Sequence, residues 1–308
     1  MKKNPLLILL GVSALFFALF LVFVFFAMGS FVKEGRNTLL SRGNYIGILP
    51  ITGVIMDSQK ALKQIKKFEE NDEIKGVIVR INSPGGAVAP SQEIYEALLR
   101  MKKTKPVIAS FDSLAASGGY YIAVATDKII TNPGTMTGSI GVIMDFANLS
   151  ELYKWAKVDR YNLKSGKFKD VGSETRAMSP EEKQLMQDMI MNVYEQFVRA
   201  VAAGRKLSAE KVRELADGRI YTGEQAFKNG LADKLGGLEV AVEEMKDMAK
   251  LKGKPNLVYP EGKKKNLFEL LTSGVAEGIV RSVANAIGLP EIDLQKAKTL
   301  QGKTLMFL

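Results

Sequence analysis

Three glycine-rich segments of the 308-residue chain each come directly after an apolar, strand-like run. They read Asn-Ser-Pro-Gly-Gly at residues 82–86, Ala-Ala-Ser-Gly-Gly-Tyr-Tyr at 115–121 and Thr-Gly-Ser-Ile-Gly at 137–141. Because the carboxyl ends of parallel strands meet at one edge of a sheet, we expect the three segments to converge there. Two N–H groups aimed at one oxygen form an oxyanion hole, and each donor stabilises the transition state by about 3–4 kcal/mol. The pattern therefore predicts a site that stabilises a developing oxyanion.

Ser117 is the best-placed hydroxyl in these segments. It stands between a strand-like run and residues 118–125, which are typical of the first turns of a buried helix. Backbone N–H groups and the positive end of the helix dipole favour a nucleophile at such a position. Spacing alone, however, favours the interpretation that Ser117 only caps the helix. In the same way, Gly85 and Gly86 fit an ordinary Pro-Gly turn, and Ser139 fits a cap or a turn.

The chain contains no histidine and no cysteine, which restricts the chemistry of any site. Ser-His-Asp and Cys-His centres cannot be built within it, and neither can zinc sites based on those side chains. No acidic run has the ligand spacing of a calcium loop, so we expect no metal. The proton-transfer group of an enzyme must then be Lys, Tyr, Asp, Glu or a cofactor, and a lysine kept neutral by burial is a familiar base for a hydroxyl nucleophile. Periodicity does not choose among Lys164, Lys167 and Lys169, and a solvated surface position is the ordinary interpretation of each.

The candidate residues must be positioned by the elements around them. From Tyr45 to Leu163, strand-like runs alternate with helical stretches. This alternation predicts an α/β domain with a largely parallel sheet. One helical face carries Leu62, Ile65 and Phe68, and a second helix carries Ile94, Leu98 and Met101. From Ser179 onward the pattern is helical, beginning with a Ser-Pro-Glu-Glu capping box, and a second box starts at Thr222. The predicted strands are Tyr45–Ile55, Gly76–Asn82, Pro106–Asp112, Lys128–Thr131, Ile140–Met144 and Val158–Leu163.

The N-terminal segment is apolar over residues 5–28, which is long enough to cross a bilayer. We interpret it as an uncleaved signal anchor rather than a cleaved signal peptide, because cleavable apolar cores are usually shorter. Lys2 and Lys3 favour a cytoplasmic N-terminus, although Lys33 and Arg36 follow closely. The predicted organisation is a cytoplasmic N-terminus at 1–4, a transmembrane anchor at 5–28, a linker at 29–43, the main domain at 44–259, and an amphipathic helix and tail at 260–308.

The formal net charge of +10 raises the possibility of nucleic-acid binding. The basic residues are nevertheless spread along the chain with acidic residues between them, and the densest cluster is only Lys263–Lys265. A solvated basic surface, which also suits anionic lipid head groups, accounts for the charge. We therefore expect no nucleic-acid partner.

The three glycine-rich motifs together resemble the bacterial signal peptide peptidase A family of Ser–Lys proteases, and the resemblance runs from the anchor to about residue 250. It implies that Ser117 is the nucleophile and that Gly86 and Gly118 form the oxyanion hole. The family's Ser-Gly-x-x-Lys-Asp motif matches residues 165–170, which selects Lys169 as the base. Ser139 matches a hydroxyl that helps to position the lysine amine.

The same resemblance implies a caseinolytic-protease/crotonase fold, with a repeated ββα core and a helical C-terminal part behind one transmembrane helix. It implies a homo-oligomer, an octameric ring in which neighbouring subunits share each site, and no cofactor. It further implies a single-pass enzyme of the bacterial inner (cytoplasmic) membrane, with its catalytic domain on the extracytoplasmic side, that degrades released signal peptides and other unfolded or membrane-associated peptides. The apolar tail at 300–308 is a candidate occupant of the substrate groove. Two rival interpretations are a crotonase-type acyl-CoA enzyme and a catalytically inactive membrane-tethered scaffold.

Overall fold

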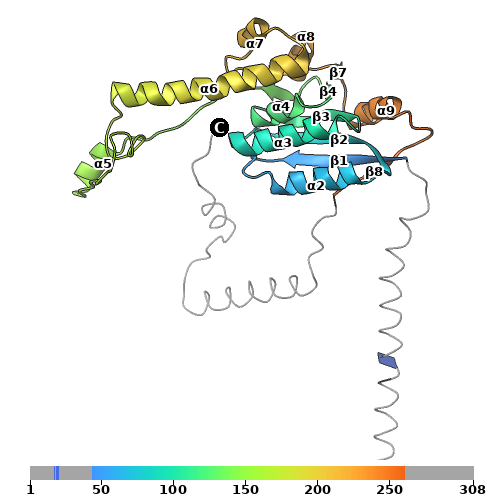
Figure 1. Ribbon diagram of the computed structural model, residues 1–308, viewed down its shortest axis with the longest axis horizontal. Coiled ribbons are helices and arrows are strands. Elements are labelled where there is room, and N and C mark those ends of the chain that lie inside the picture. The colour runs from blue at the N-terminus through green and yellow to red at the C-terminus, as the bar shows by residue number, and fades with distance from the viewer. Residues whose placement is uncertain (1–16, 18, 21–43, 261–308) are drawn as a thin grey trace, which may run out of the picture. The chain divides into compact units, whose positions relative to one another are not determined.

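The computed structural model describes residues 17, 19, 20 and 44–260 (Figure 1). The chain divides into two units, Met1–Gly43 and Asn44–Leu308. None of the helices formed by the described residues has the length and hydropathy needed to cross a bilayer. Most of the predicted anchor at 5–28, the predicted linker and the tail after residue 260 lie outside the described residues.

The second unit is built on an eight-stranded sheet in which the predicted parallel arrangement is confirmed. Its main path runs β6-β5-β3-β2-β1-β8, while β4 pairs with both β3 and β7. Every strand pair is parallel except β5 with β6. The strands are β1 (Tyr45–Thr52), β2 (Ile74–Ser83), β3 (Val107–Ala116), β4 (Lys128–Thr131), β5 (Met136–Gly138), β6 (Ile220–Thr222), β7 (Lys234–Leu235) and β8 (Asn256–Val258).

Both faces of this sheet are covered, which explains why its central strands are apolar without alternation. On β2, Val77 and Val79 belong to the larger core, which also holds buried residues of α2 (Gln59–Glu70), α3 (Val88–Met101) and α4 (Gly118–Ala123). Ile78 points to the opposite face and packs with Met245 of α9 (Leu238–Met248). The helices predicted between the first three strands are thus confirmed as α2 and α3.

The helical part after residue 179 is also confirmed. It holds α6 (Pro180–Arg205), α7 (Ala209–Leu215) and α8 (Gly223–Lys228). Both predicted capping boxes are present, with Ser179 opposite Glu182 at the start of α6 and Thr222 opposite Gln225 at the start of α8. Each box satisfies two backbone N–H groups, one at the cap residue and one in the first helical turn, that have no intrahelical partner.

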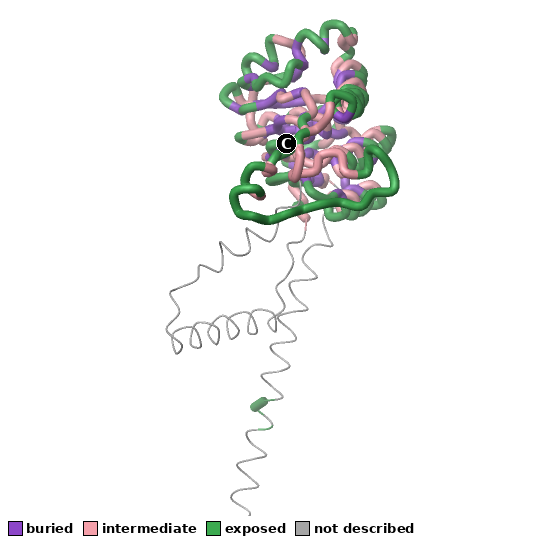
Figure 2. Tube along the Cα trace, turned by 90° about the vertical axis from the view of Figure 1, so that its left-hand side faces the viewer, coloured by how far each residue is buried: buried purple, intermediate pink, exposed green. Residues whose placement is uncertain are grey.

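Two predicted strands are wrong. No strand forms at Ile140–Met144 or at Val158–Leu163. We call residues 142–179 the extension. The first of these segments overlaps its start, and the second lies within it. The extension carries α5 (Ser150–Trp155) and lies beyond the N-terminal end of α6, away from α4 (Figure 1). Figure 2 views this side of the molecule and shows it mostly exposed. No strand formed by the described residues pairs with the extension, so the strand propensity of its β-branched residues is not realised.

Candidate active site

Ser117 occupies a strained turn between β3 and α4. Its backbone has φ 50° and ψ −119°, a conformation that residues other than glycine rarely adopt. Its side chain makes no capping hydrogen bond to α4, so the interpretation of Ser117 as a simple helix cap is wrong. The turn is held from both sides, because the Ser117 amide donates to the Gly138 carbonyl at 2.9 Å and the Ser117 carbonyl accepts from the Tyr121 amide at 2.8 Å. Strain at a residue held this firmly is typical of a functional position.

The Gly85–Gly86 turn packs directly against Ser117. A Cβ added at Gly85 would lie 2.8 Å from the Ser117 Cβ and 2.7 Å from the Gly118 nitrogen, and Gly85 has a φ of 102°. A Cβ at Gly86 would lie 2.2 Å from the carbonyl oxygen of Ile55. Both positions therefore need glycine, for backbone conformation and for space.

As a result of this packing, the backbone amides of Gly86 and Gly118 lie beside the Ser117 side chain. Gly118 is the first residue of α4, where a helix leaves its N–H without an intrahelical partner. An ideal Cβ at Gly118 would lie 3.4 Å from the Gly86 nitrogen, so the two amides are close neighbours. The Gly86 turn is fixed by a pair of 2.8 Å hydrogen bonds with Ile55, one from the Ile55 amide to Gly85 and one from the Ala87 amide to Ile55. This arrangement has the elements of an oxyanion hole.

A small pocket of about 40 Å³ opens at Ser117. Its wall offers apolar and small side chains, and among the described residues it contains no carboxylate and no amine. Tyr121 is its one titratable group, and burial raises the pKa of that phenol, so the phenol stays protonated and is a poor base. The lining residues are Gly86, Val88, Ser91, Gln92, Ser117, Gly118, Tyr121, Gly141, Val142, Val193 and Phe197.

Ser139 follows β5 directly beside the Ser117 turn. Like Ser117 it has a positive φ, 48°, and its amide donates to the Arg219 carbonyl at 2.9 Å. Its neighbour Gly138 is paired with Ala116 in the sheet. The predicted convergence of the three glycine-rich segments is therefore found in the structure.

Lys169 is not part of this group. It lies in the extension, is exposed, and lines an open hollow of about 500 Å³ that shares no residue with the Ser117 pocket. Lys164 lines the same hollow and pairs with Asp170 at 2.6 Å, while Lys167 pairs with Glu181 at the start of α6. Within one chain the structure thus brings Ser117, Gly86, Gly118 and Ser139 together and leaves Lys169 elsewhere.

The charged groups next to Lys169 are strongly coupled to one another. Hydrogen bonds from Arg176 and then Lys164 hold the pKa of the Asp170 carboxyl well below its usual range. Arg176, followed by the Ser179 amide, lowers the pKa of Glu182 to about 2. Both carboxylates therefore carry full negative charge at neutral pH, and Arg176 lies between them.

Known proteins with similar sequences define the family. Residues 100–252 match peptidase family S49, and residues 48–137 match the Clp protease family. A putative protease from Synechocystis sp. is 41% identical over 247 residues, which cover 80% of this chain and 88% of the relative. The chain belongs to peptidase family S49. The resemblance stated from the motifs is thereby confirmed, and this S49 chain is a serine endopeptidase whose mixed α/β sheet fits a Clp protease-like domain.

In other relatives of this S49 peptidase, the matched region is a smaller share of the relative's own length. A putative signal peptide peptidase SppA from Enterococcus faecium is 40% identical over 224 residues, which are 72% of this chain and 62% of the relative. The chloroplastic serine protease SPPA of Arabidopsis thaliana is 33% identical over 237 residues, 76% of this chain and 35% of that protein. This S49 chain therefore corresponds to only part of the longer relatives.

Sequence reasoning missed several residues of the S49 site. Val193 and Phe197 had the spacing of a helix face that packs into a core, but they line the Ser117 pocket from α6. Ser83 was assigned no role, although its hydroxyl donates to the Gly53 carbonyl at 2.6 Å and accepts from the Gly85 amide at 3.1 Å. Ser83 lies within the first glycine-rich motif, so a hydroxyl two residues before a Gly-Gly pair was a signal that could have been used.

Proposed function

We propose that this serine endopeptidase cuts peptides with a Ser–Lys dyad in which Ser117 and Lys169 come from neighbouring copies of the chain. One observation carries the proposal: the pocket at Ser117 contains no basic group among the described residues, whereas Lys169 lies exposed on the extension. A nucleophilic serine needs a base within hydrogen-bond reach. The extension also exposes apolar side chains that suit burial against another copy, namely Ile143, Phe146, Leu152, Trp155, Val158, Tyr161, Leu163 and Phe168.

The proposed chemistry is acyl transfer. The neutral amine of Lys169 accepts the hydroxyl proton of Ser117 while Oγ attacks the carbonyl carbon of the scissile peptide bond. The resulting oxyanion accepts hydrogen bonds from the Gly86 and Gly118 amides. The Lys169 ammonium then gives its proton to the departing amine, and an ester to Ser117 remains. Water, deprotonated by the same amine, hydrolyses the ester and restores both side chains.

Ser139 is the proposed partner of the Lys169 amine. Its position beside the Ser117 turn supports this role, since an incoming amine near Ser117 also comes near the Ser139 hydroxyl. A hydrogen bond to that hydroxyl orients the amine lone pair toward Ser117.

The proposed substrates are released signal peptides and other unfolded or membrane-associated peptides. The apolar wall formed by Val88, Val142, Val193 and Phe197 supports this class, because a pocket of about 40 Å³ accepts small or slender apolar side chains. The name of the Enterococcus relative agrees with it. The further parts of the proposal are an octameric ring, a repeated ββα core, a single transmembrane anchor at residues 5–28 of the bacterial inner membrane, and a catalytic domain outside the cytoplasm.

Subunit complementation tests the shared site. Ser117→Ala and Lys169→Ala chains are unfolded, mixed in equal amounts and reassembled, and peptide cleavage is measured. If each site takes its serine from one subunit and its lysine from the next around a ring, random assembly leaves about one quarter of the sites intact. Each variant reassembled alone is the control and should be inactive. Absence of any recovered activity in a correctly assembled mixture contradicts the shared dyad.

The two rival interpretations predict different results in simpler assays. An inactive scaffold predicts that a fluorophosphonate probe does not label Ser117. A crotonase-type acyl-CoA enzyme uses the oxyanion amides but needs neither Ser117 nor Lys169, so it predicts unchanged turnover in both alanine variants. Labelling of Ser117 that is lost in Lys169→Ala supports the peptidase.

A further inference from the structure

The loop that carries Lys169 has no helix or strand of its own. Between residues 164 and 176 its backbone is a series of turns, with hydrogen bonds such as Lys169 N–H to the Gly166 carbonyl at 3.2 Å and Ser173 N–H to the Asp170 carbonyl at 3.0 Å. Turns of this kind fix the local conformation. Among the described residues, the backbone of the loop is bonded to another part of the extension at Glu174, whose carbonyl accepts from the Leu149 amide at 2.7 Å. Closer to Lys169, the loop is held by side-chain contacts of its neighbours.

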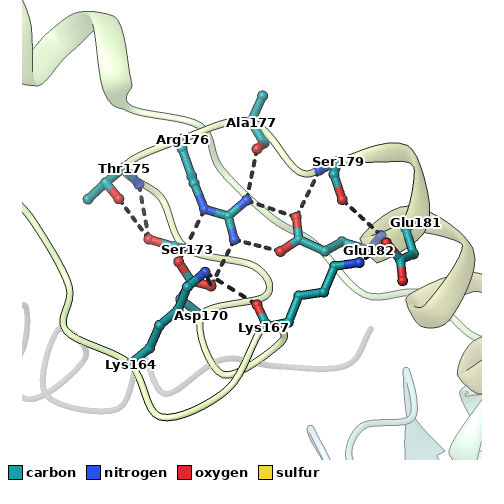
Figure 3. A network of polar contacts seen from close by, with 10 residues as sticks. All are labelled: Lys164, Lys167, Asp170, Ser173, Thr175, Arg176, Ala177, Ser179, Glu181 and Glu182. Carbon is teal, nitrogen blue, oxygen red and sulfur yellow. Dashed lines mark hydrogen bonds and ion pairs between the residues drawn. The ribbon is translucent and has the colours of Figure 1, made fainter.

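Arg176 makes those contacts as a two-sided fork (Figure 3). On one side it binds Asp170, which directly follows Lys169, through Nε at 3.2 Å and Nη2 at 2.9 Å. On the other side it binds Glu182 through Nη1 at 2.8 Å and Nη2 at 2.6 Å. A planar guanidinium can hold two carboxylates in this way, and an ammonium cannot.

Glu182 is a rigid anchor for that fork. Its side chain is only 5% exposed, it accepts from the Ser179 amide at 2.8 Å, and it completes the capping box of α6. Asp170 is also largely buried, at 13% exposed. Arg176 thus joins the residue next to Lys169 to the first turn of the longest described helix.

The fork also determines whether the carboxylates near Lys169 are paired with other cations. Asp170 is held by Arg176 and Lys164, Glu182 by Arg176, and Glu181 by Lys167. The nearest carboxylate in sequence is therefore already engaged and does not pair with the Lys169 amine. A free carboxylate at that position would stabilise the ammonium form and oppose its use as a base.

We propose that Arg176 is a positioning residue for peptide hydrolysis, which holds the Lys169 loop on the start of α6 and keeps the Asp170 carboxylate away from the Lys169 amine. This inference rests on the proposed role of Lys169. Arg176 itself touches neither the nucleophile nor the substrate, and it acts through the placement and charge environment of its neighbour.

The same extension offers a matched control. Arg160 pairs with Glu174 and donates to the Tyr153 hydroxyl at 2.9 Å, on the exposed side of the extension. It makes none of the contacts recorded for Asp170 or Glu182 among the described residues. Loss of Arg160 removes a guanidinium from the extension but leaves Glu174, the loop residue that it pairs with, held by the Tyr153 hydroxyl and the Leu149 amide.

The test compares Arg176→Gln, Arg176→Lys and Arg160→Gln in the full-length protein, with kcat, KM and the pH dependence of kcat measured on a peptide substrate. We expect Arg176→Gln to lower kcat by about 10- to 100-fold, since misplacing a catalytic group by 1 Å costs about 100-fold. KM should change by less than about twofold, because uniform binding of substrate is unaffected. The pH of half-maximal kcat should rise when Asp170 is released, because a free carboxylate favours the protonated base.

The conservative variants separate positioning from a merely structural role. Arg176→Lys restores the charge without the fork, so it should return the pH profile toward that of the wild type while kcat stays low. Arg160→Gln should match the wild type in both measurements. Assembly is checked by size-exclusion chromatography, and if Arg176→Gln fails to assemble, Asp170→Asn takes its place and should lower kcat in the same range.

Two outcomes overturn the inference. A correctly assembled Arg176→Gln enzyme with wild-type kcat and pH profile shows that the fork does not position Lys169. Where Asp170→Asn is used instead, a wild-type kcat shows the same. Lys169→Ala is measured alongside: activity that survives in it contradicts the proposed dyad and this inference together. If Lys169→Ala is inactive while Arg176→Gln is unchanged, only the role of Arg176 is lost.

Discussion

The Ser117 amide donates a 2.9 Å hydrogen bond to the Gly138 carbonyl, and this bond joins two of the three glycine-rich segments. It continues the pairing of β3 with β5 by one residue, at the point where β3 ends. The strained turn of Ser117 is thereby fixed to the sheet rather than left to the loop. Positions 117 and 139 consequently each follow one residue of the paired Ala116 and Gly138.

Replacing Ser117 by alanine should abolish cleavage while the fold is kept. We expect kcat to fall by about 10⁶-fold, as it does when the nucleophile of a serine protease is removed. The substitution deletes one half-buried hydroxyl that does not cap α4, so the circular dichroism spectrum should be unchanged. Ser113→Ala, at an exposed position of the same strand, is the control and should cleave normally. Comparable kcat values for the two variants would remove Ser117 from the mechanism.

Replacing Lys169 by arginine should also inactivate the enzyme. Arginine keeps the positive charge but does not lose its proton in the accessible pH range, so it cannot accept the serine proton. Lys169→Arg should therefore stay inactive over the whole pH range in which the wild-type enzyme cleaves peptide. The measurement is a pH profile of peptide cleavage for both proteins, and a lysine that serves only as a charge would leave the arginine variant active.

A methyl group at Gly86 should damage both stability and activity. The added Cβ would meet the Ile55 carbonyl oxygen at 2.2 Å, at a residue whose φ is 154°. We expect a loss of about 2 kcal/mol or more in the free energy of unfolding from strain and overpacking. Gly134→Ala is the control, because a Cβ there meets no atom within 4 Å. Urea unfolding of the two variants measures the difference, and equal midpoints would show that the turn relaxes freely.

Acid should release the attachment of the extension to α6. Because the pKa of Glu182 is lowered from 4.5 to about 2 in the folded chain, its contribution to stability is complete above pH 4.5 and is lost as the pH falls toward 2. The difference in Tm between the wild type and Glu182→Gln should therefore be largest above pH 4.5 and shrink at lower pH. A difference that stays constant from pH 6 to 2 would mean that the Glu182 charge plays no part.

Much of the fold was predictable because its signals are local. The helix faces of α2 and α3 and the caps at Ser179 and Thr222 are set by residues three or four positions apart. The first four predicted strands correspond to β1, β2, β3 and β4. By contrast, Val158–Leu163 pairs with none of the strands in residues 44–260, and pairing depends on distant parts of the chain.

The sequence by itself limited the chemistry open to this protein: histidine and cysteine are absent, and the three glycine-rich motifs resemble a family of Ser–Lys proteases. Only the tertiary structure decided where the serine and the lysine implied by this resemblance lie. It joins Ser117 to Gly86, Gly118 and Ser139 at one edge of the sheet, and it leaves Lys169 on the extension with Arg176 between two buried carboxylates. The physical reason is the distance along the sequence between the interacting residues. Composition and local spacing show which groups the chain contains. Strand pairing, burial and ion pairs between distant residues decide which of these groups come into contact.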